Sequence, residues 1–199
     1  AHVSNVLGYV APIKEIVILA HAVGARVVVD GTQAAGRMPV NLHELQADYY
    51  AASGHKLYGP GGTGWLYAPP EILNQAEPLL MGGGTIEEVT RDSVRWQRAP
   101  ARFEAGTPNL IGVVGLGRAI EYLSQVGMKN VWQHDQALAA YLTQRLTQLP
   151  GIQIYGQPQA AIVPFVLMIK GKLVHSHDVA EIADSRQVAL RGGHHCAQV

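Results

Sequence analysis

The chain has 199 residues, of which 48% are hydrophobic and 15% charged, a composition typical of a globular protein. Its 15 basic and 15 acidic residues cancel, so composition gives no reason to expect nucleic acid or an anionic membrane surface as a partner. The hydrophobic runs are too short for a membrane-spanning helix. The single cysteine excludes an internal disulfide, which suits a reducing compartment, and no His/Cys spacing resembles a zinc site.

The first third of the chain predicts strands that alternate with helices. Residues 2–7 are interpreted as the end of a strand, and residues 12–24 as a helix with a proline in its first turn and a glycine at its end. A strand over 26–30 follows, so this order predicts a parallel βαβ unit with a right-handed crossover. The next expected elements are a helical turn at 42–45, a strand at 48–53, an antiparallel strand at 63–67 and a short helix from Pro69.

The remainder predicts two long helices and a small α+β region. Residues 81–85 form an expected loop, and the polar stretch 86–97 favours no single structure. Residues 109–126 predict a helix in which Gly112, Gly115 and Gly117 allow close packing. The last expected elements are a helix at 128–149 with Val131, Leu138, Leu142 and Leu146 inward, strands at 152–155, 162–169 and 188–190, and a helix at 176–186 capped by Ser176.

One lysine, Lys56, follows a predicted buried strand and stands after Ser53, Gly54 and His55. Burial opposes the charge of an amine and lowers its pKa, which helps where a neutral amine must attack a carbonyl to form a Schiff base. Ser and His can bind a phosphate, and glycine lets the backbone approach a ligand closely. The alternative is a strand, a turn and a surface lysine.

A carboxylate, Asp30, ends the preceding predicted strand. A lysine and an aspartate at the ends of two strands are the two protein groups that a pyridoxal phosphate (PLP) site needs. The lysine carries the cofactor as an aldimine, and the aspartate keeps the ring nitrogen protonated, so that the ring acts as an electron sink. The alternative for Asp30 is a turn residue at a strand end.

Four ordered segments carry a resemblance to a known family: VDGTQ at 29–33, SGHK at 53–56, FEAGTPN at 103–109 and RGGHHCAQ at 191–198. The chain resembles group II (SUF-type) cysteine desulfurases of the class V aminotransferase group, nearly from end to end. The resemblance implies an α/β, PLP-dependent transferase of fold type I (aminotransferase-like). Residues 1–119 would form the C-terminal half of a large PLP-binding domain with a mostly parallel sheet, and residues 120–199 part of a small α+β domain.

Members of that family are about twice this long, and the chain does not begin with Met. We therefore interpret it as a fragment that lacks the N-terminal half and the C-terminal end. Val199 stands where the family usually has proline.

The resemblance assigns roles to individual residues. Lys56 resembles the Schiff-base lysine, and Cys196 the residue that forms a persulfide. Asp30 resembles the partner of the ring nitrogen, and Gln33 the group that bonds the phenolic oxygen of the cofactor. Ser53 and His55 resemble phosphate ligands, and Thr107 a residue that reaches the phosphate in the neighbouring subunit. Asn5 and Arg191 resemble groups near the substrate carboxylate; Arg191 could instead form an ion pair at a domain interface.

The implied reaction converts L-cysteine to L-alanine and leaves sulfur on Cys196 as a persulfide, which passes to a SufE- or SufU-type acceptor for iron–sulfur cluster assembly. The resemblance also implies a cytoplasmic homodimer, and selenocysteine is a reasonable second substrate. One alternative is another class V PLP enzyme, such as an aminotransferase, epimerase or kynureninase, although those reactions need no thiol. The other is a truncated subunit without a competent cofactor site, serving as an interaction or remnant module.

Overall fold

The computed structural model describes residues 1–198, so Val199 and the expectation attached to it lie outside the described residues. The chain divides into two compact units, which are described separately. The sheet unit comprises Pro12–Gly36 and Val40–Gln125, and the C-terminal unit comprises Ala1–Ala11, Arg37–Pro39 and the residues from Val126 onward. Within residues 1–198, no helix is both long enough and apolar enough to cross a membrane.

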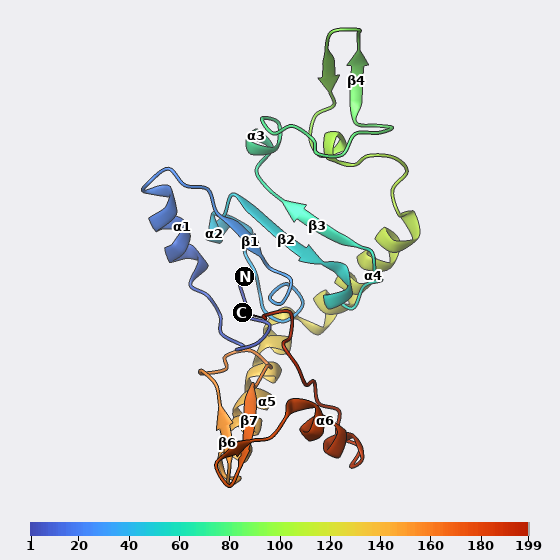
Figure 1. The fold of residues 1–199 in the computed structure, drawn as a ribbon. Helices are drawn as coiled ribbons and strands as arrows, with labels where there is room; N and C mark the ends of the chain where they lie inside the picture. Colours follow the sequence, from blue (N-terminus) through green and yellow to red (C-terminus); the bar gives the residue numbers. More distant parts are fainter. Residues whose placement is uncertain (199) are drawn as a thin grey trace. The chain divides into compact units, whose positions relative to one another are not determined.

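The sheet unit is built on three strands in the order β1-β2-β3, which lie side by side in Figure 1: β1 (Val28–Asp30), β2 (Tyr49–Ser53) and β3 (Gly64–Tyr67). β1 pairs with β2 in parallel, and β2 pairs with β3 antiparallel. Tyr50, in the central strand, is fully buried and stacks on Trp65 of β3 with 5.7 Å between ring centroids. The parallel pair is what places the ends of β1 and β2 at the same edge of the sheet.

Two helices precede β2, and local signals explain both. α1 (Ile13–His21) buries Ile13 and Val17, which are one helical turn apart, and Gly24 follows it with a positive φ. α2 (Leu42–Leu45) is capped by Asn41, whose side chain accepts from the backbone N–H groups of His43 and Glu44. These elements match the predicted helices at 12–24 and 42–45.

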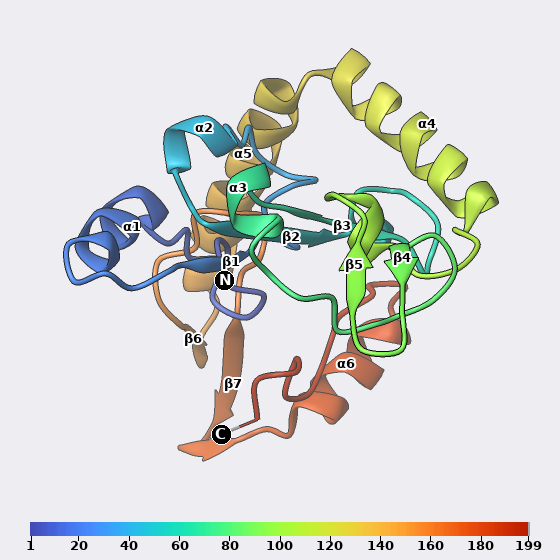
Figure 2. The same cartoon turned by 90° about the horizontal axis from the view of Figure 1, so that it is seen from above.

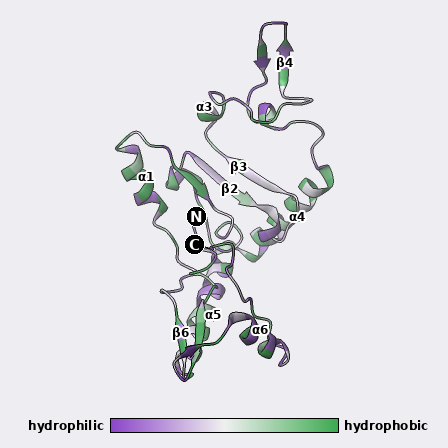
Figure 3. Ribbon diagram, viewed as in Figure 1, coloured by the Kyte–Doolittle hydropathy of each residue, from purple (hydrophilic) through white to green (hydrophobic). Residues whose placement is uncertain are grey.

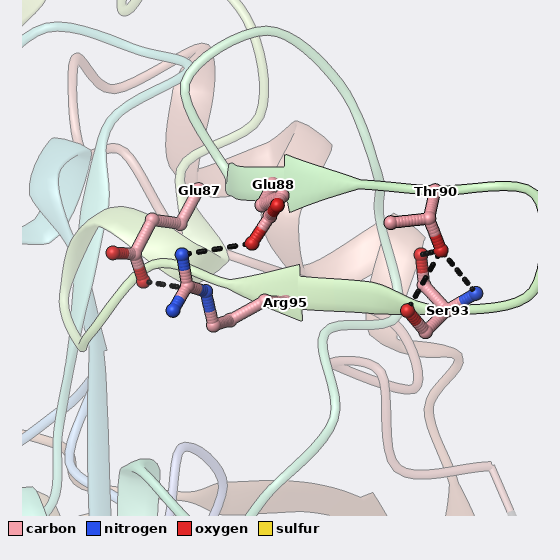
Figure 4. Close-up of polar contacts among 5 residues, drawn as sticks. All are labelled: Glu87, Glu88, Thr90, Ser93 and Arg95. Atoms are coloured by element: carbon pink, nitrogen blue, oxygen red, sulfur yellow. Dashed lines mark hydrogen bonds and ion pairs between the residues drawn. The ribbon is translucent and has the colours of Figure 1, made fainter.

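The polar stretch that favoured no structure forms a hairpin of β4 (Ile86–Val89) and β5 (Val94–Trp96), which projects beyond the three-stranded sheet in Figure 1. A register shift between Ile86 and Glu88 lets two adjacent glutamates reach one arginine. Arg95 lies 3.5 Å from Glu87 and 2.9 Å from Glu88, and the close-up in Figure 4 shows its guanidinium between them. The hairpin turn is closed by a 2.9 Å hydrogen bond between the hydroxyls of Thr90 and Ser93 (Figure 4).

The long helix α4 (Leu110–Val126), seen from the side in Figure 2, is the last element of the sheet unit. It follows the short helix α3 (Pro70–Leu73) and the 3-10 turn η2 (Ala101–Phe103). A Cβ on Gly112 would meet Thr63 and Asn109, and one on Gly115 would meet Pro60, which confirms the expected close packing at these two glycines. Gly117 faces open space, so the same expectation is wrong there.

The C-terminal unit packs an antiparallel sheet of order β6-β7-β8 against α5 (Met128–Thr147), which follows Gly127 at φ +86° (Figure 1). Its strands are β6 (Ile152–Ile154), β7 (Phe165–Ile169) and β8 (Lys172–Leu173), and α6 (Ser176–Asp184) comes last. β7 is hydrophobic along its length (Figure 3), as the prediction of a strand at 162–169 requires. β8 was not predicted.

Five further expectations about local structure are wrong. Residues 2–7 form no regular strand: Val3 makes a single antiparallel bridge to Val10, and residues 5–7 form a turn, in which the Ser4 hydroxyl accepts from the N–H groups of Val6 and Leu7. The first predicted βαβ unit is therefore not formed. Residues 188–190 follow Gln187, which has a positive φ, and form no strand. The N-cap of α6 is His175 and not Ser176, because the His175 side chain accepts from the His177 N–H. In α5, Leu138 and Leu142 are exposed, although both were expected to face inward.

Candidate functional site

The ends of β1 and β2 bring the predicted lysine and aspartate to one edge of the sheet. Asp30 is the last residue of β1 and pairs in register with Ala51 of β2. The ladder continues one step further, because the Gly31 N–H donates to the Ala51 carbonyl at 2.7 Å. β2 ends at Ser53, and the 3-10 turn η1 (Gly54–Lys56) follows without a gap. Asp30 therefore stands at the carboxyl end of β1, and Lys56 follows shortly after the carboxyl end of the neighbouring parallel strand β2.

The Asp30 carboxylate is held in its ionised form. Its Oδ1 accepts from the Thr32 backbone N–H at 2.9 Å, closing a turn directly after the strand. Partial burial raises the pKa of the Asp30 carboxyl, but the hydrogen bonds from Thr32, together with smaller charge effects that include Lys56, outweigh burial, so the pKa lies below its usual value. Asp30 is therefore negatively charged at neutral pH, which is the charge that would pair with a protonated pyridine nitrogen.

Close backbone packing ties the Asp30 turn to the Lys56 turn. A Cβ on Gly31 would overlap the ring of Tyr50, and a Cβ on Gly36 would overlap the carbonyl oxygen of Lys56. Only glycine allows the two turns to approach this closely. Burial, helped by the charge of Asp30, raises the pKa of the Tyr50 phenol and keeps it neutral beneath the site.

The predicted phosphate ligands and the lysine lie together in η1 and at its start. The Gly54 N–H donates to the Thr63 carbonyl at 2.8 Å, which joins η1 to the start of β3. Ser53 is half-buried, whereas His55 and Lys56 are exposed. The desolvation expected for a lysine after a buried strand is therefore absent in this chain. Gln33 is half-buried in the turn that begins at Asp30.

Thr107 lies on an exposed loop that leads into α4. The loop is fixed on one side by a 2.9 Å hydrogen bond from the Gly106 N–H to the Gly83 carbonyl. On the other side, the buried Arg102 donates from Nη1 to the Asn74 carbonyl at 2.6 Å. The contact between Gly83 and Gly106 places the loop at residues 81–85 beside the Thr107 loop.

The other three predicted residues belong to the C-terminal unit. Asn5 lies in the Ser4 turn, and its Nδ2 donates to the His195 carbonyl at 2.5 Å. Cys196 is exposed, and both it and His195 have positive φ values. Arg191 is exposed, and the neighbouring Gly192 packs closely against the Ser176 carbonyl. The structure thus groups Asn5 with the cysteine loop and, in the sheet unit, Asp30 with Lys56.

Sequence reasoning missed Arg102, which bonds to the Asn74 carbonyl ahead of the Thr107 loop, and Tyr50, whose ring packs against Gly31. Arg102 directly precedes the FEAGTPN segment, and a charged residue in an otherwise apolar 3-10 turn was the available signal. Tyr50 lies opposite Gly31, and the strand pattern alone did not reveal that pairing. Across residues 1–198, no cluster of three or more His, Cys, Asp or Glu side chains could hold a metal ion.

Comparisons with known proteins agree with this arrangement. The sequence profile of the family described as "Aminotransferase class-V" matches residues 1–199. A "probable cysteine desulfurase" from Halalkalibacterium halodurans is 43% identical over 198 residues, which cover 99% of this chain and 48% of the relative. The chain thus spans about half the length of the curated relative that it matches.

Two solved structures share the fold. One is the cysteine desulfurase CsdA from Escherichia coli in an S-sulfonic acid form, with a TM-score of 0.90, 36% identity, and coverage of 99% of this chain and 48% of that one. The other is a lysine-to-alanine mutant of C-DES with glycine covalently linked to its PLP cofactor, with a TM-score of 0.82, 27% identity, and coverage of 96% and 51%. The aminotransferase-like fold is therefore confirmed, and the chain belongs to the class V aminotransferase family.

Proposed function

We propose that this protein is a PLP-dependent cysteine desulfurase of the group II type, which converts L-cysteine to L-alanine. The observation that carries the proposal is the shared edge of β1 and β2, where an ionised Asp30 and Lys56 follow neighbouring parallel strands. The exposed Cys196 supplies the thiol that this reaction needs and that other class V reactions do not. The similarity to a probable cysteine desulfurase supports the same activity.

The side chains at this edge fit PLP by their chemistry. Asp30 would pair with the ring nitrogen, Gln33 with the phenolic oxygen, and Ser53 and His55 with the phosphate. When bound, the cofactor supplies an electron sink for the bonds at the substrate Cα. Lys56 would hold the cofactor and then move a proton at Cα, for which its exposed amine is free to swing. Thr107 would reach the phosphate in a second subunit of a homodimer.

Cys196 would take up the sulfur. Its thiolate attacks the substrate sulfur, so that an S–S bond forms as the C–S bond breaks, and the carbon skeleton gains a proton to leave as alanine. The step needs no outside oxidant: forming the S–S bond oxidises the two sulfurs by two electrons in total, and the substrate Cβ, which exchanges its C–S bond for a C–H bond, takes up the same two electrons. Arg191 would lie near the substrate carboxylate, and selenocysteine would fit the same chemistry.

The wider setting belongs to the same proposal. A SufE- or SufU-type protein would accept the persulfide sulfur for iron–sulfur cluster assembly, and an exposed Cys196 is suited to such a transfer. A cytoplasmic location suits a protein whose single cysteine forms no internal disulfide. Residues 1–119 would belong to the large PLP-binding domain and residues 120–199 to the small one.

The test mixes the chain with PLP, records the absorbance of lysine-bound cofactor, and then measures alanine formed from L-cysteine. We expect the absorbance to appear in the wild-type protein and in Lys14→Ala, and to be lost in Lys56→Ala. Cys196→Ser should keep the absorbance while alanine formation collapses. Transamination of a keto acid without alanine formation would indicate another class V enzyme, and absence of the absorbance would indicate that this chain has no competent cofactor site.

A further inference from the structure

The cysteine sits at the second central position of a strained turn. The Ala197 N–H donates to the His194 carbonyl at 2.9 Å, which closes a four-residue turn with His195 and Cys196 at its centre. These two residues have φ values of +54° and +60°, a combination that usually requires glycine or asparagine. Something outside the turn must therefore favour this backbone over the relaxed alternatives.

Asn5 is the outside contact, and it comes from a segment that is itself held firmly. The Gly8 N–H donates to the Ser4 carbonyl at 3.1 Å, and the Ser4 N–H donates to the Tyr9 carbonyl at 2.9 Å. The Gly8 carbonyl in turn accepts from the N–H groups of Gln159 and Ala160. The Ser4 turn is thus fastened to the body of the C-terminal unit, and Asn5 extends from it.

The amide of Asn5 bonds to the peptide group that directly precedes the cysteine. Its Nδ2 donates to the carbonyl of His195, which belongs to the peptide bond between the two central residues of the turn. Rotation of that peptide would change ψ of His195 and φ of Cys196 together, and the hydrogen bond opposes this rotation. At the other end of the loop, Gly192 packs on the Ser176 carbonyl, so the loop is held at two places.

We propose that Asn5 is a positioning residue for Cys196, which fixes the strained turn in the orientation that presents the thiol. The proposal rests on the proposed function in one respect: Cys196 is the sulfur-accepting group. It differs from the role near the substrate carboxylate that resemblance assigned to Asn5, because the amide proton used here acts on the enzyme's own loop.

The first test measures hydrogen exchange of the Ala197 amide by NMR in the full chain. Asn5→Asp keeps the shape of the side chain but removes the donor, and Asn5→Ala removes the side chain without adding charge. Since one hydrogen bond is lost, protection of the Ala197 amide should fall about threefold to tenfold in both variants. Asn130→Asp is the matched control, because Asn130 Nδ2 also donates to a backbone carbonyl, that of Val126 at 2.7 Å. It should leave Ala197 unchanged.

The second test separates positioning from substrate binding in the kinetics of alanine formation with PLP present. Asn5→Ala should lower kcat while the KM for cysteine stays within about twofold. Unchanged protection of Ala197 in both variants would overturn the proposal, and so would an effect on KM alone, which would assign Asn5 to the substrate. Failure of the proposed function would give a different result. Cys196→Ser would then desulfurate cysteine normally, whereas both Asn5 variants would still lose protection of the Ala197 amide.

Discussion

The Asp48 carboxylate lies 2.9 Å from Nε2 of His21, which joins the end of α1 to the start of β2. The same Oδ2 atom accepts from the Val27 N–H at 2.7 Å, just before β1 begins. One carboxylate therefore connects the helix and both parallel strands. Because Asp30 and Lys56 follow those strands, the geometry of the candidate site depends on this junction.

We predict that Asp48→Asn lowers the free energy of unfolding by about 0.5–1.5 kcal/mol at pH 7, since the hydrogen bonds from the exposed His21 and the half-buried Val27 lose their charged acceptor. Burial raises the pKa of Asp48, but the hydrogen bonds from His21 and Val27 and the charge of His21 outweigh it, so the pKa is lowered. A lowered pKa stabilises the fold above the unfolded-state pKa of about 3.9, and this contribution is lost as pH falls through the folded-state value.

Urea unfolding at a series of pH values checks this prediction. The difference between wild type and Asp48→Asn should be largest near neutrality and should shrink below about pH 4. Asp92→Asn is the control, because Asp92 is exposed at the tip of the hairpin. A difference that stays constant down to acid pH would show that the carboxylate charge at position 48 does not matter.

A second prediction concerns the backbone beneath the site. Gly31→Ala should destabilise the fold by about 1–3 kcal/mol, because its new methyl group would overlap the fully buried ring of Tyr50. Gly61→Ala provides the comparison, since a Cβ there meets nothing within 4 Å. The denaturant midpoint of Gly31→Ala should be clearly lower than that of Gly61→Ala. Equal midpoints would mean that the Tyr50 ring moves aside without destabilising the fold.

A third prediction locates the cofactor bond. Borohydride reduction of the chain with PLP, followed by peptide mapping, should leave the label on Lys56. Lys56 is exposed and lies at the same sheet edge as the anionic Asp30, whose pKa its charge helps to lower. Lys129→Ala should keep the label in place. A label recovered mainly on another lysine would remove Lys56 from its proposed role.

A fourth prediction is that the ion pairs of the β4–β5 hairpin contribute little. Arg95, Glu87 and Glu88 are all about half exposed or more, so solvent and salt screen their charges. Arg95→Ala should change the free energy of unfolding by no more than about 0.5 kcal/mol at low salt, and less at high salt. Chemical denaturation at two salt concentrations tests this, and a loss well above that range would show a larger structural role.

The elements that the sequence predicted well have a periodic hydrophobic pattern or a strong end signal. The helix at 42–45 has Asn41 before it, and the strand at 48–53 alternates buried and half-buried residues. The hairpin could not be predicted because its strands expose nearly all of their side chains, so no period of two appears. Its pairing depends instead on cross-strand contacts that a single sequence does not reveal.

The candidate site was predictable in the same uneven way. Residues next to a strand end, such as Asp30 and Lys56, could be placed from the order of the elements. The bond between Asn5 and His195 joins residues 190 positions apart, and no local pattern indicates it. The expectation that Lys56 would be desolvated is wrong in this chain because the turn after β2 directs it outward.

The exposure of Cys196 has a practical consequence for anyone who handles the protein. An accessible thiol passes readily to sulfenic acid, and then to sulfinic and sulfonic acids, which ordinary reductants do not restore. Cys196 is the only cysteine of the chain, so its oxidation leaves no free thiol for a thiol reagent to detect. The oxidised protein then lacks the same reactive group as the Cys196→Ser variant. Under the proposed function, air exposure during purification would therefore stop sulfur uptake by Cys196, and the mass of the intact chain would record the oxidation.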